Sequence, residues 1–493
     1  MELQFQQDLL RGKQLVKCEV RNLEETQELR LPDGMPDIGR VLGAWGQVLL
    51  RGKQWQSGNV QVSGGVQVWI LYVADDGGEV CHTQTWLPFQ AKWDLPDMGK
   101  DGMICAEALL HNVDARNTSA RKLMVRANVS VLGQMWIDQD FAMYTPGQLP
   151  SDIQLLECTD CIQLPSKGGE KAFSLDEELT LPAAAPQIEE IMCYRLQPEL
   201  LDKKIMSDKV VFRGTALLHM LYMGADGQLH NWDHEMPFSQ YAELEQDFSQ
   251  DASAQITMAV TSLELEMQPE GRLRVKIGMT GQYIISDRVE LHTVKDAFSP
   301  YRKVDPILQE LVLPAIMDSQ QYSVSAEKML PVTGSVVDLS FLPDHPDRRG
   351  DLDLSGQFRL LYRDDNGQLQ TAQGRWEDRL QMQYPVDAVI MSASRPCGKV
   401  QAAFDGSVML TQADMIVDTI VFPGHSTIFV KALEVAEETV PDPERPSLIL
   451  TRAGKQSLWN LAKQYGSSVD SIMQTNELDA DPIPGTMLLI PVL

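Results

Sequence analysis

The sequence predicts a mainly β protein: three tandem antiparallel repeats, each β-sandwich-like, followed by a small βααβ unit. Three observations support this fold class. A hairpin motif recurs three times in the first 440 residues, and stretches of alternating apolar and polar residues follow each copy. Residues 447–493 then change to helical spacing between two short apolar runs.

The recurring hairpin places an apolar strand that ends in Leu-Tyr before a turn with glycine five residues after the tyrosine. Asp-Gly and Asn-Gly turns between alternating strands are strong hairpin signals. A tryptophan follows each copy, and because tryptophan buries a large apolar area we expect Trp86, Trp232 and Trp376 to be core residues. The three copies are VQVWILYVADDGGEV (66–80), TALLHMLYMGADGQL (215–229) and GQFRLLYRDDNGQLQ (356–370).

A Leu-Pro segment precedes the first two hairpins, as LPDGMPDIGRV (31–41) and LPAAAPQIEEI (181–191). The third hairpin has only a loose counterpart, VDPILQELVLP (304–314). Helix content should be low outside these segments and the βααβ unit. We expect three β domains, over residues 1–150, 151–300 and 301–433.

Residues 434–446 join the third repeat to the βααβ unit. They are acidic and contain three prolines, a composition typical of an extended polar linker. The sequence therefore predicts that the unit at residues 447–493 moves independently of the β domains.

The unit at 447–493 has a start or stop signal for each of its elements. Strands are expected at Leu448–Leu450 and Met487–Ile490, and Gly466 suits the left-handed residue that ends a helix. Ser467 or Ser468 can cap a second helix. The apolar residues at helical spacing are Leu458, Trp459, Leu461, Ala462 and Tyr465, then Val469, Ile472 and Met473.

This pattern resembles the LysM domain, whose members commonly bind N-acetylglucosamine chains between the turn after the first strand and the loop before the second. Lys455 and Gln456 replace the aspartate usual in that first turn, which leaves Ser457 as the expected helix cap. The surface could therefore bind a glycan or a protein. The resemblance implies a binding face of Gly454, Lys455, Gln456, Ser457, Leu458 and Trp459 on one loop and Leu478, Asp479, Ile483, Pro484 and Gly485 on the other.

Composition narrows the classes of partner. The formal net charge of −27 disfavours binding to nucleic acid or to an anionic membrane surface. We find no signal peptide and no apolar run of 18 residues, and the seven scattered cysteines suit a reducing compartment. The sequence thus predicts a cytoplasmic protein without membrane insertion.

No catalytic or cofactor motif is evident, and we expect neither enzyme activity nor a cofactor. The GxSxG, P-loop and GxGxxG patterns are absent. Cys158 and Cys161 form a CxxC pair, but no second ligand pair with zinc-site spacing follows. His230 and His234 flank Trp232 without the glutamate of a metalloprotease motif. We interpret both pairs as structural or surface residues, so no metal site is predicted.

The Leu-Pro segment at 31–41, the Leu-Tyr hairpins and the single LysM-like unit together resemble spore coat morphogenetic proteins of the SipL type, whose β domain is called SPOCS. The resemblance implies a scaffold in the mother-cell cytosol, at the forespore surface. In that family the LysM domain binds a coat morphogenetic ATPase, stage IV sporulation protein A, and other coat proteins are further expected partners. The alternative partner is a peptidoglycan or other N-acetylglucosamine polymer.

Overall fold

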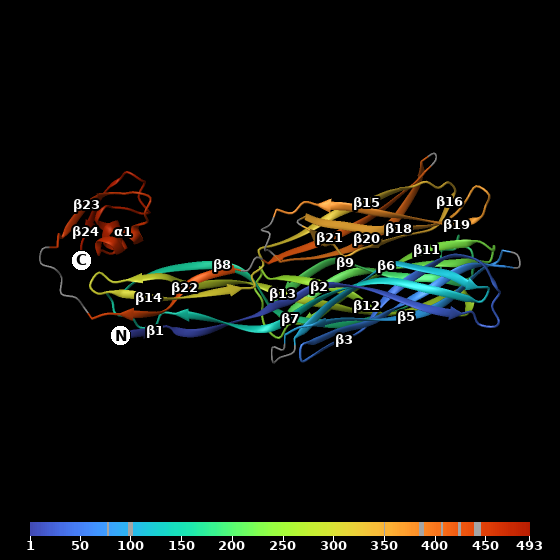
Figure 1. The fold of residues 1–493 in the computed structure, drawn as a ribbon, viewed down its shortest axis with the longest axis horizontal. Coiled ribbons are helices and arrows are strands. Elements are labelled where there is room, and N and C mark those ends of the chain that lie inside the picture. The colour runs from blue at the N-terminus through green and yellow to red at the C-terminus, as the bar shows by residue number, and fades with distance from the viewer. Residues whose placement is uncertain are drawn as a thin grey trace.

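The computed structural model describes the chain apart from residues 76–77, 97–101, 350, 384–388, 406–407, 423–424 and 438–444. The predicted mainly β fold is confirmed, because antiparallel strands form most of the described chain (Figure 1). The two α-helices of the described residues both lie in the final unit, residues 447–493. The first predicted hairpin turn, at Asp76, and most of the predicted linker lie outside the described residues.

The first repeat folds as two three-stranded antiparallel sheets, in the orders β3-β4-β5 and β2-β7-β6. The chain starts in one sheet, forms a three-strand meander in the other and then returns. Alternate residues of the strands face inward, among them Val62, Val68, Val125 and Val129 of the core. The strands are β2 (Gln6–Arg30), β3 (Ile38–Gln56), β4 (Asn59–Ala74), β5 (Val80–Asp94), β6 (Met103–Ser119) and β7 (Lys122–Thr145).

The second repeat has the same connectivity, with sheets β9-β10-β11 and β8-β13-β12. A short 3₁₀ turn, η1 (Pro269–Gly271), joins its last two strands. The strands are β8 (Gln154–Leu179), β9 (Ile188–Met206), β10 (Lys209–Gly224), β11 (Leu229–Glu243), β12 (Ser253–Met267) and β13 (Leu273–Phe298).

The third repeat keeps this arrangement in sheets β16-β18-β19 and β15-β21-β20, and the short β17 (Asp347–Arg349) also pairs with β18. Its strands are β15 (Asp318–Leu330), β16 (Ser335–Pro343), β18 (Asp351–Arg363), β19 (Leu369–Leu380), β20 (Val389–Asp405) and β21 (Val408–Phe422).

The Leu-Pro segments contain turns and no helix. Met35 N–H donates to the Pro32 carbonyl at 3.1 Å, and Ala185 N–H donates to the Pro182 carbonyl at 2.9 Å. The hairpin tyrosine holds the first segment in place, since the Tyr72 hydroxyl donates to the Pro36 carbonyl at 3.2 Å. The first Leu-Pro segment and the first hairpin are thus joined by a hydrogen bond.

The three tryptophans are not equivalent core residues. Trp376 is buried in the core of its own repeat, together with Phe341. Trp232 is half-buried beside the second core, and Trp86 is half-buried against the core of the neighbouring repeat. The expectation of three core tryptophans is therefore right only for Trp376.

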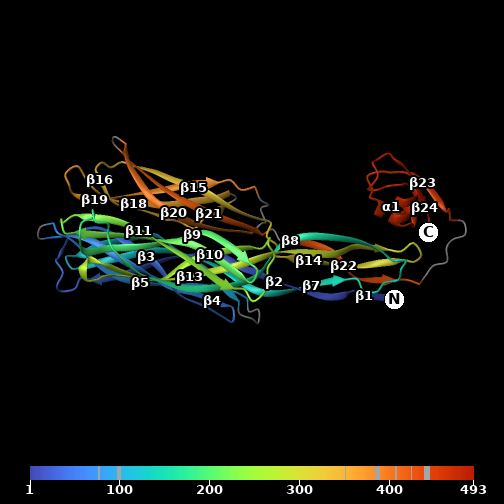
Figure 2. The same ribbon diagram turned by 180° about the vertical axis from the view of Figure 1, so that it is seen from behind.

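A narrow stalk extends from the body of the molecule (Figures 1 and 2). It consists of the outer halves of the long strands β2, β7, β8 and β13, together with β14 (Val304–Leu313), β22 (His425–Val435) and β1 (Glu2–Gln4). β22 lies between β1 and β14 in one sheet. Small clusters fill the stalk, including Phe5, Val294 and Val430. β22 also takes up the first two residues of the predicted linker, Glu434 and Val435.

The three repeats contact one another in a cycle. β3 of the first repeat contacts β12 of the second, β9 of the second contacts β20 of the third, and β16 of the third contacts β6 of the first. Each of β3, β9 and β16 has a register shift at the same place, at Leu42, Met192 and Val337. A β-bulge re-aims a side chain, and all three residues belong to one buried cluster shared by the repeats.

A buried carboxylate lies next to this shared cluster. Asp338 occupies the position that Gly43 and Cys193 hold in the other repeats, opposite the leucine before the hairpin tyrosine. Trp45 Nε1 donates to it at 2.8 Å and Arg195 Nη2 at 3.1 Å, and His219 Nε2 lies 2.6 Å from it. Burial alone would raise the pKa of Asp338, but Arg195 and His219 hold it well below its ordinary value. One side chain thus links all three repeats.

The final unit has the expected order of elements. Ser457 Oγ accepts from the Asn460 N–H and Ser468 Oγ from the Ser471 N–H, so each helix has a serine N-cap. Gly466 ends the first helix in the left-handed conformation, at φ 64°. The elements are β23 (Leu448–Arg452), α1 (Leu458–Tyr465), α2 (Val469–Thr475) and β24 (Met487–Pro491), and the two strands pair antiparallel.

Candidate functional site

The structure brings the two predicted loops of the final unit together. Gly485 N–H donates to the Ala453 carbonyl at 2.7 Å, and Ala453 N–H donates to the Thr486 carbonyl at 2.7 Å. The predicted residues differ in exposure, with Ile483 79% exposed. Gly454, Lys455, Gln456, Asp479, Ile483, Pro484 and Gly485 are exposed, Ser457 and Leu478 are half-buried, and Leu458 and Trp459 are buried.

Asp481 supplies the carboxylate that the first turn lacks. Its Oδ1 accepts from the Leu458 N–H at 3.1 Å, next to the Ser457 cap. Ser457 is therefore not the sole cap of α1, as the sequence had indicated. A carboxylate at a helix N-terminus is favourable because it satisfies a free N–H and faces the positive end of the helix dipole.

Replacing Asp481 with alanine should destabilise the final unit by about 1 kcal/mol, the usual value of a helix N-cap. Hydrogen exchange of residues 458–465, measured by mass spectrometry on the whole chain, should accelerate. Asp479→Ala, two residues away in the same loop, is the matched control. Equal exchange in the two variants would show that Asp481 does not support α1.

The final unit packs against the far end of the stalk. The Trp459 indole Nε1 donates to Asp296 Oδ2 at 2.9 Å, and Lys463 Nζ lies 2.7 Å from the same oxygen. The Phe298 ring meets Trp459 edge-on, with 4.8 Å between ring centroids. Gln154 Nε2 donates to the Ser467 carbonyl at 3.1 Å. In this structure the final unit therefore lies in contact with the stalk, whereas the sequence predicted a unit that moves independently.

The geometry of β13 presents Asp296 to the final unit. The register between β13 and β8 shifts between Val294 and Asp296, so Lys295 is a bulged residue. Val294 and Ala297 then face the stalk interior, while Asp296 is turned outward. Partial burial would raise the pKa of Asp296, but hydrogen bonds from Lys463 and Trp459 hold it below its ordinary value.

A cavity of about 800 Å³ lies between the final unit and the stalk and is lined by residues of both. Its stalk wall is Gln154–Glu157, at the start of β8, and its opposite wall includes Ser457, Trp459 and Asp481. The groove between the two predicted loops thus opens towards the tip of the second repeat. Sequence reasoning missed Asp296, Phe298, Lys463 and Asp481, and of these only Asp481 lies in a loop that the sequence had indicated.

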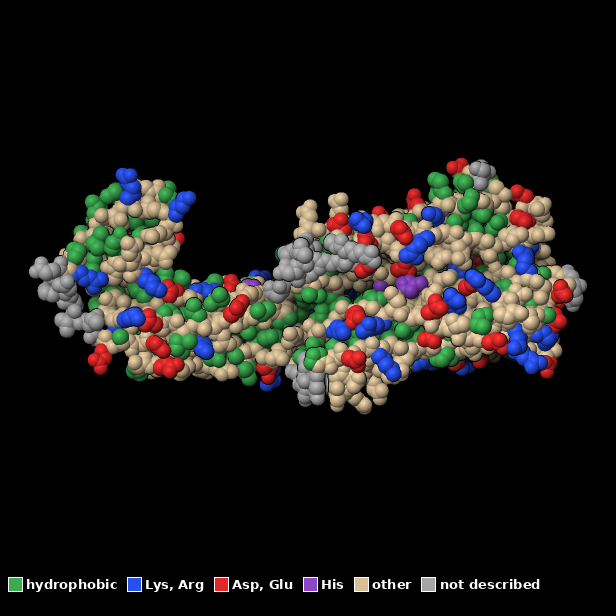
Figure 3. Space-filling view, viewed as in Figure 1, with side chains coloured by type: hydrophobic (Ala, Val, Ile, Leu, Met, Phe, Trp, Pro, Cys, Tyr) green, Lys and Arg blue, Asp and Glu red, His purple; other side chains and the backbone are tan. Residues whose placement is uncertain are grey.

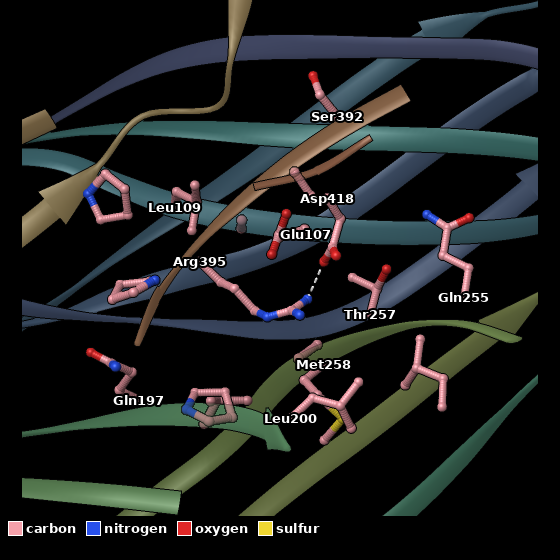
Figure 4. Close-up of a pocket in the computed structure, with 18 of the residues that line it drawn as sticks. Glu107, Leu109, Gln197, Leu200, Gln255, Thr257, Met258, Ser392, Arg395 and Asp418 are labelled. Atoms are coloured by element: carbon pink, nitrogen blue, oxygen red, sulfur yellow. Dashed lines mark hydrogen bonds and ion pairs between the residues drawn. The ribbon is translucent and has the colours of Figure 1, made fainter. Parts of the chain in front are cut away.

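A second cavity lies between the three repeats. It has a volume of about 710 Å³ and extends from Arg195 and His219 to Trp136 and Phe422. Charged side chains from different strands reach into it, and Arg395 pairs there with Asp418 (Figure 4). Gln134 Oε1 and Trp136 Nε1 have no hydrogen-bond partner among the described residues. A polar cavity of this size has room for water that would satisfy them.

The polar residues singled out for metal chemistry do not gather. His230 Nε2 lies 3.0 Å from Asp226 Oδ2 in its own hairpin, and His234 stacks near Trp232. Cys161 is exposed and Cys158 is half-buried at the stalk. Among the described residues no group of three or more His, Cys, Asp or Glu side chains is placed to hold a metal ion. The surface carries acidic and basic side chains interspersed (Figure 3).

Comparison with known proteins identifies two domains. Residues 187–268, from the start of β9 to the end of β12, match the SipL SPOCS domain, and residues 455–491 match the LysM domain. No curated protein and no solved structure matches the chain. Both families are of non-catalytic domains.

Neither described helix is long and apolar enough to cross a membrane. The β-rich body and the two helices of the final unit agree with the two domain matches. The chain therefore carries a match to the SipL SPOCS domain followed by a match to the LysM domain, which is the order of the SipL-type architecture.

Proposed function

We propose that the chain is a non-enzymatic scaffold for spore coat assembly. The LysM domain docks a coat morphogenetic ATPase that resembles stage IV sporulation protein A, at the forespore surface in the mother-cell cytosol. The three β domains, over residues 1–150, 151–300 and 301–433, offer further surfaces for coat proteins. The pairing of SPOCS and LysM domains in one chain supports this function.

One observation carries the choice of a protein partner over a sugar. Trp459 of the LysM face already packs against protein, since its indole and the neighbouring Lys463 bind the Asp296 carboxylate and Phe298 meets the indole edge-on. Lys455 and Ile483, on the two loops of this face, stay exposed. An exposed isoleucine beside a basic turn suits an apolar and acidic protein surface.

Changing Ile483 to glutamate should reduce capture of the ATPase from sporulating cells at least about tenfold, because it buries a charge in the contact. Ile483 is 79% exposed, so the fold should survive. Leu201→Glu is the matched control, because Leu201 is 64% exposed on the body. Quantitative immunoblotting of tagged full-length chain measures the capture. Unchanged capture by the Ile483 variant would reject this face as the docking site.

The alternative partner is an N-acetylglucosamine polymer, and the groove of about 800 Å³ beside Ser457 and Asp481 favours it. Sedimentation of the unaltered chain and of the Ile483→Glu chain with purified peptidoglycan tests this alternative. Protein docking predicts that the full chain remains in the supernatant. Sedimentation that Ile483→Glu abolishes would instead assign the face to a glycan.

A further inference from the structure

The end of β13, in the second repeat, lies against the LysM face. Its two contacting side chains, Asp296 and Phe298, indicate the chemistry that this face recognises. Trp459 and Lys463 are four residues apart on α1, so their side chains lie on one side of the helix. Both donate to a single carboxylate, with Lys463 Nζ 2.8 Å from Asp296 Oδ1 and 2.7 Å from Oδ2. Phe298, two residues along β13, packs edge-on against the indole.

We infer that this face is a recognition site for an extended strand end that carries aspartate two residues before an aromatic residue, and that β13 fills it in cis. The inference rests on the proposed function of the LysM domain as a protein-docking module. A partner that docks here therefore presents the same pair of side chains, an aspartate and an aromatic residue, and displaces β13.

The stalk itself does not require this arrangement. Val294 and Ala297 already fill the stalk core, and the bulge at Lys295 turns Asp296 away from it. Asp296 makes its remaining contact with its neighbour, by accepting from the Ala297 N–H at 2.9 Å. The side chains of Asp296 and Phe298 therefore make their main contacts with the LysM domain and not with the stalk core.

The other two repeats lack this pair at the stalk tip. The corresponding strand β7 ends in Met143, Tyr144 and Thr145, and β22 ends in Leu433, Glu434 and Val435. β13 ends in Asp296, Ala297 and Phe298. Of these three strand ends, only that of β13 combines a carboxylate with an aromatic residue at this spacing. The choice of the second repeat thus follows from side-chain chemistry that its neighbours do not share.

Because β13 of the same chain already fills the site, any external strand end has to compete with β13 for it. Two parts of one chain meet at an effective concentration in the millimolar range, which exceeds that of most partners in solution. An external strand end must therefore bind more tightly than β13, or find β13 displaced. Removing the Asp296 carboxylate should open the site.

The test uses a fluorescent peptide with the sequence of residues 290–302 and the full-length chain, measured by fluorescence anisotropy. The Asp296→Ala chain should bind this peptide at least about fivefold more tightly than the unaltered chain does. A peptide with asparagine in place of its aspartate should bind the Asp296→Ala chain at least about fivefold more weakly. Adding Lys463→Ala to the Asp296→Ala chain should have the same effect. Asp305→Ala is the matched control, since Asp305 lies at the same end of the stalk and pairs with Lys303 at 2.7 Å.

Equal binding of the peptide by the unaltered and Asp296→Ala chains, or equal binding of the asparagine peptide, would overturn the inference. Capture of the ATPase is measured separately on the same variants. If the peptide behaves as expected but the ATPase is captured by neither chain, the proposed function fails and the recognition site stands. If the ATPase is captured equally by both chains and the peptide does not bind, only the recognition site fails.

Discussion

Replacing Asp338 with alanine should lower the stability of the body by about 3–5 kcal/mol, the usual cost of removing one partner from a buried ion pair. The carboxylate is 1% exposed and receives Trp45 from the first repeat and Arg195 and His219 from the second. Its loss leaves Arg195 without its carboxylate partner and leaves His219 with Asp233 alone. Thermal unfolding followed by circular dichroism measures the effect.

Asp353→Ala is the matched control for Asp338, because Asp353 pairs with Arg379 at the surface of the same repeat, at 2.7 Å. Exposed pairs of this kind contribute about 0–1 kcal/mol. If the two variants melt within a degree of each other, Asp338 does not hold the repeats together.

The pH dependence of this link has a definite sign. The pKa of Asp338 is lowered in the folded chain, so its contribution is present above about pH 4 and is lost as the pH falls through the folded pKa. The pKa of His219 is raised in the folded chain. Burial and the charge of Arg195 lower it, but Asp338 and Asp233 raise it by more. The contribution of His219 is therefore complete below about pH 6.5 and is lost as the pH rises through its folded pKa. The Asp338→Ala variant should lose the first dependence, and the second should weaken because only Asp233 still raises the pKa of His219.

Replacing Leu71 with alanine should cost about 2–5 kcal/mol and loosen all three repeats at once. Leu71 is fully buried in the cluster that also contains Cys193 and Leu361 of the other repeats. A cavity there removes apolar contacts within the cluster in which the three repeats meet. Hydrogen exchange measured by mass spectrometry should accelerate in β9 and β16 as well as in β4.

Leu123→Ala provides the comparison, since Leu123 is equally buried but belongs to the core cluster of the first repeat and not to the cluster around Leu71. It should destabilise its own repeat by a similar amount and leave the exchange of β16 unchanged. Indistinguishable exchange maps for the two variants would mean that the repeats do not stabilise one another through this cluster.

The sequence predicted the elements with strong local signals. Turn chemistry located the hairpins after Tyr222 and Tyr362, and the caps at Ser457 and Gly466 placed α1 to the residue. These signals act over a few residues, so they are readable without knowledge of the fold. The mainly β class followed from the same patterns.

The sequence did not predict the stalk, because apolar and polar residues alternate little in the strand segments that form it. The outer half of β2 has a burial pattern dominated by exposed and half-buried residues, with Phe5 just before it as an isolated anchor. A narrow bundle of strands has a small core, and few apolar residues are needed to fill it. Periodicity therefore weakens where the structure departs from a two-sheet body.

The candidate site was predicted in part for a similar reason. The resemblance to LysM located both loops, and the structure brings them together. Asp296 and Phe298 lie more than 150 residues from Trp459 in the sequence, and no local pattern connects them. Asp338 escaped notice as well, because a single aspartate at a position held by Gly43 and Cys193 elsewhere signals nothing until the repeats are seen to meet.

The stalk also sets a distance. β14 and β22 contain 10 and 11 residues, so the stalk holds the LysM domain roughly 30 Å beyond the body at the usual rise of a strand. Strands from all three repeats brace it on several sides, which resists bending better than a single hairpin would. As long as β13 stays docked on it, the LysM domain is kept at a fixed interval from the body. The length of these strands therefore sets how far the LysM domain stands from the three repeats in this arrangement.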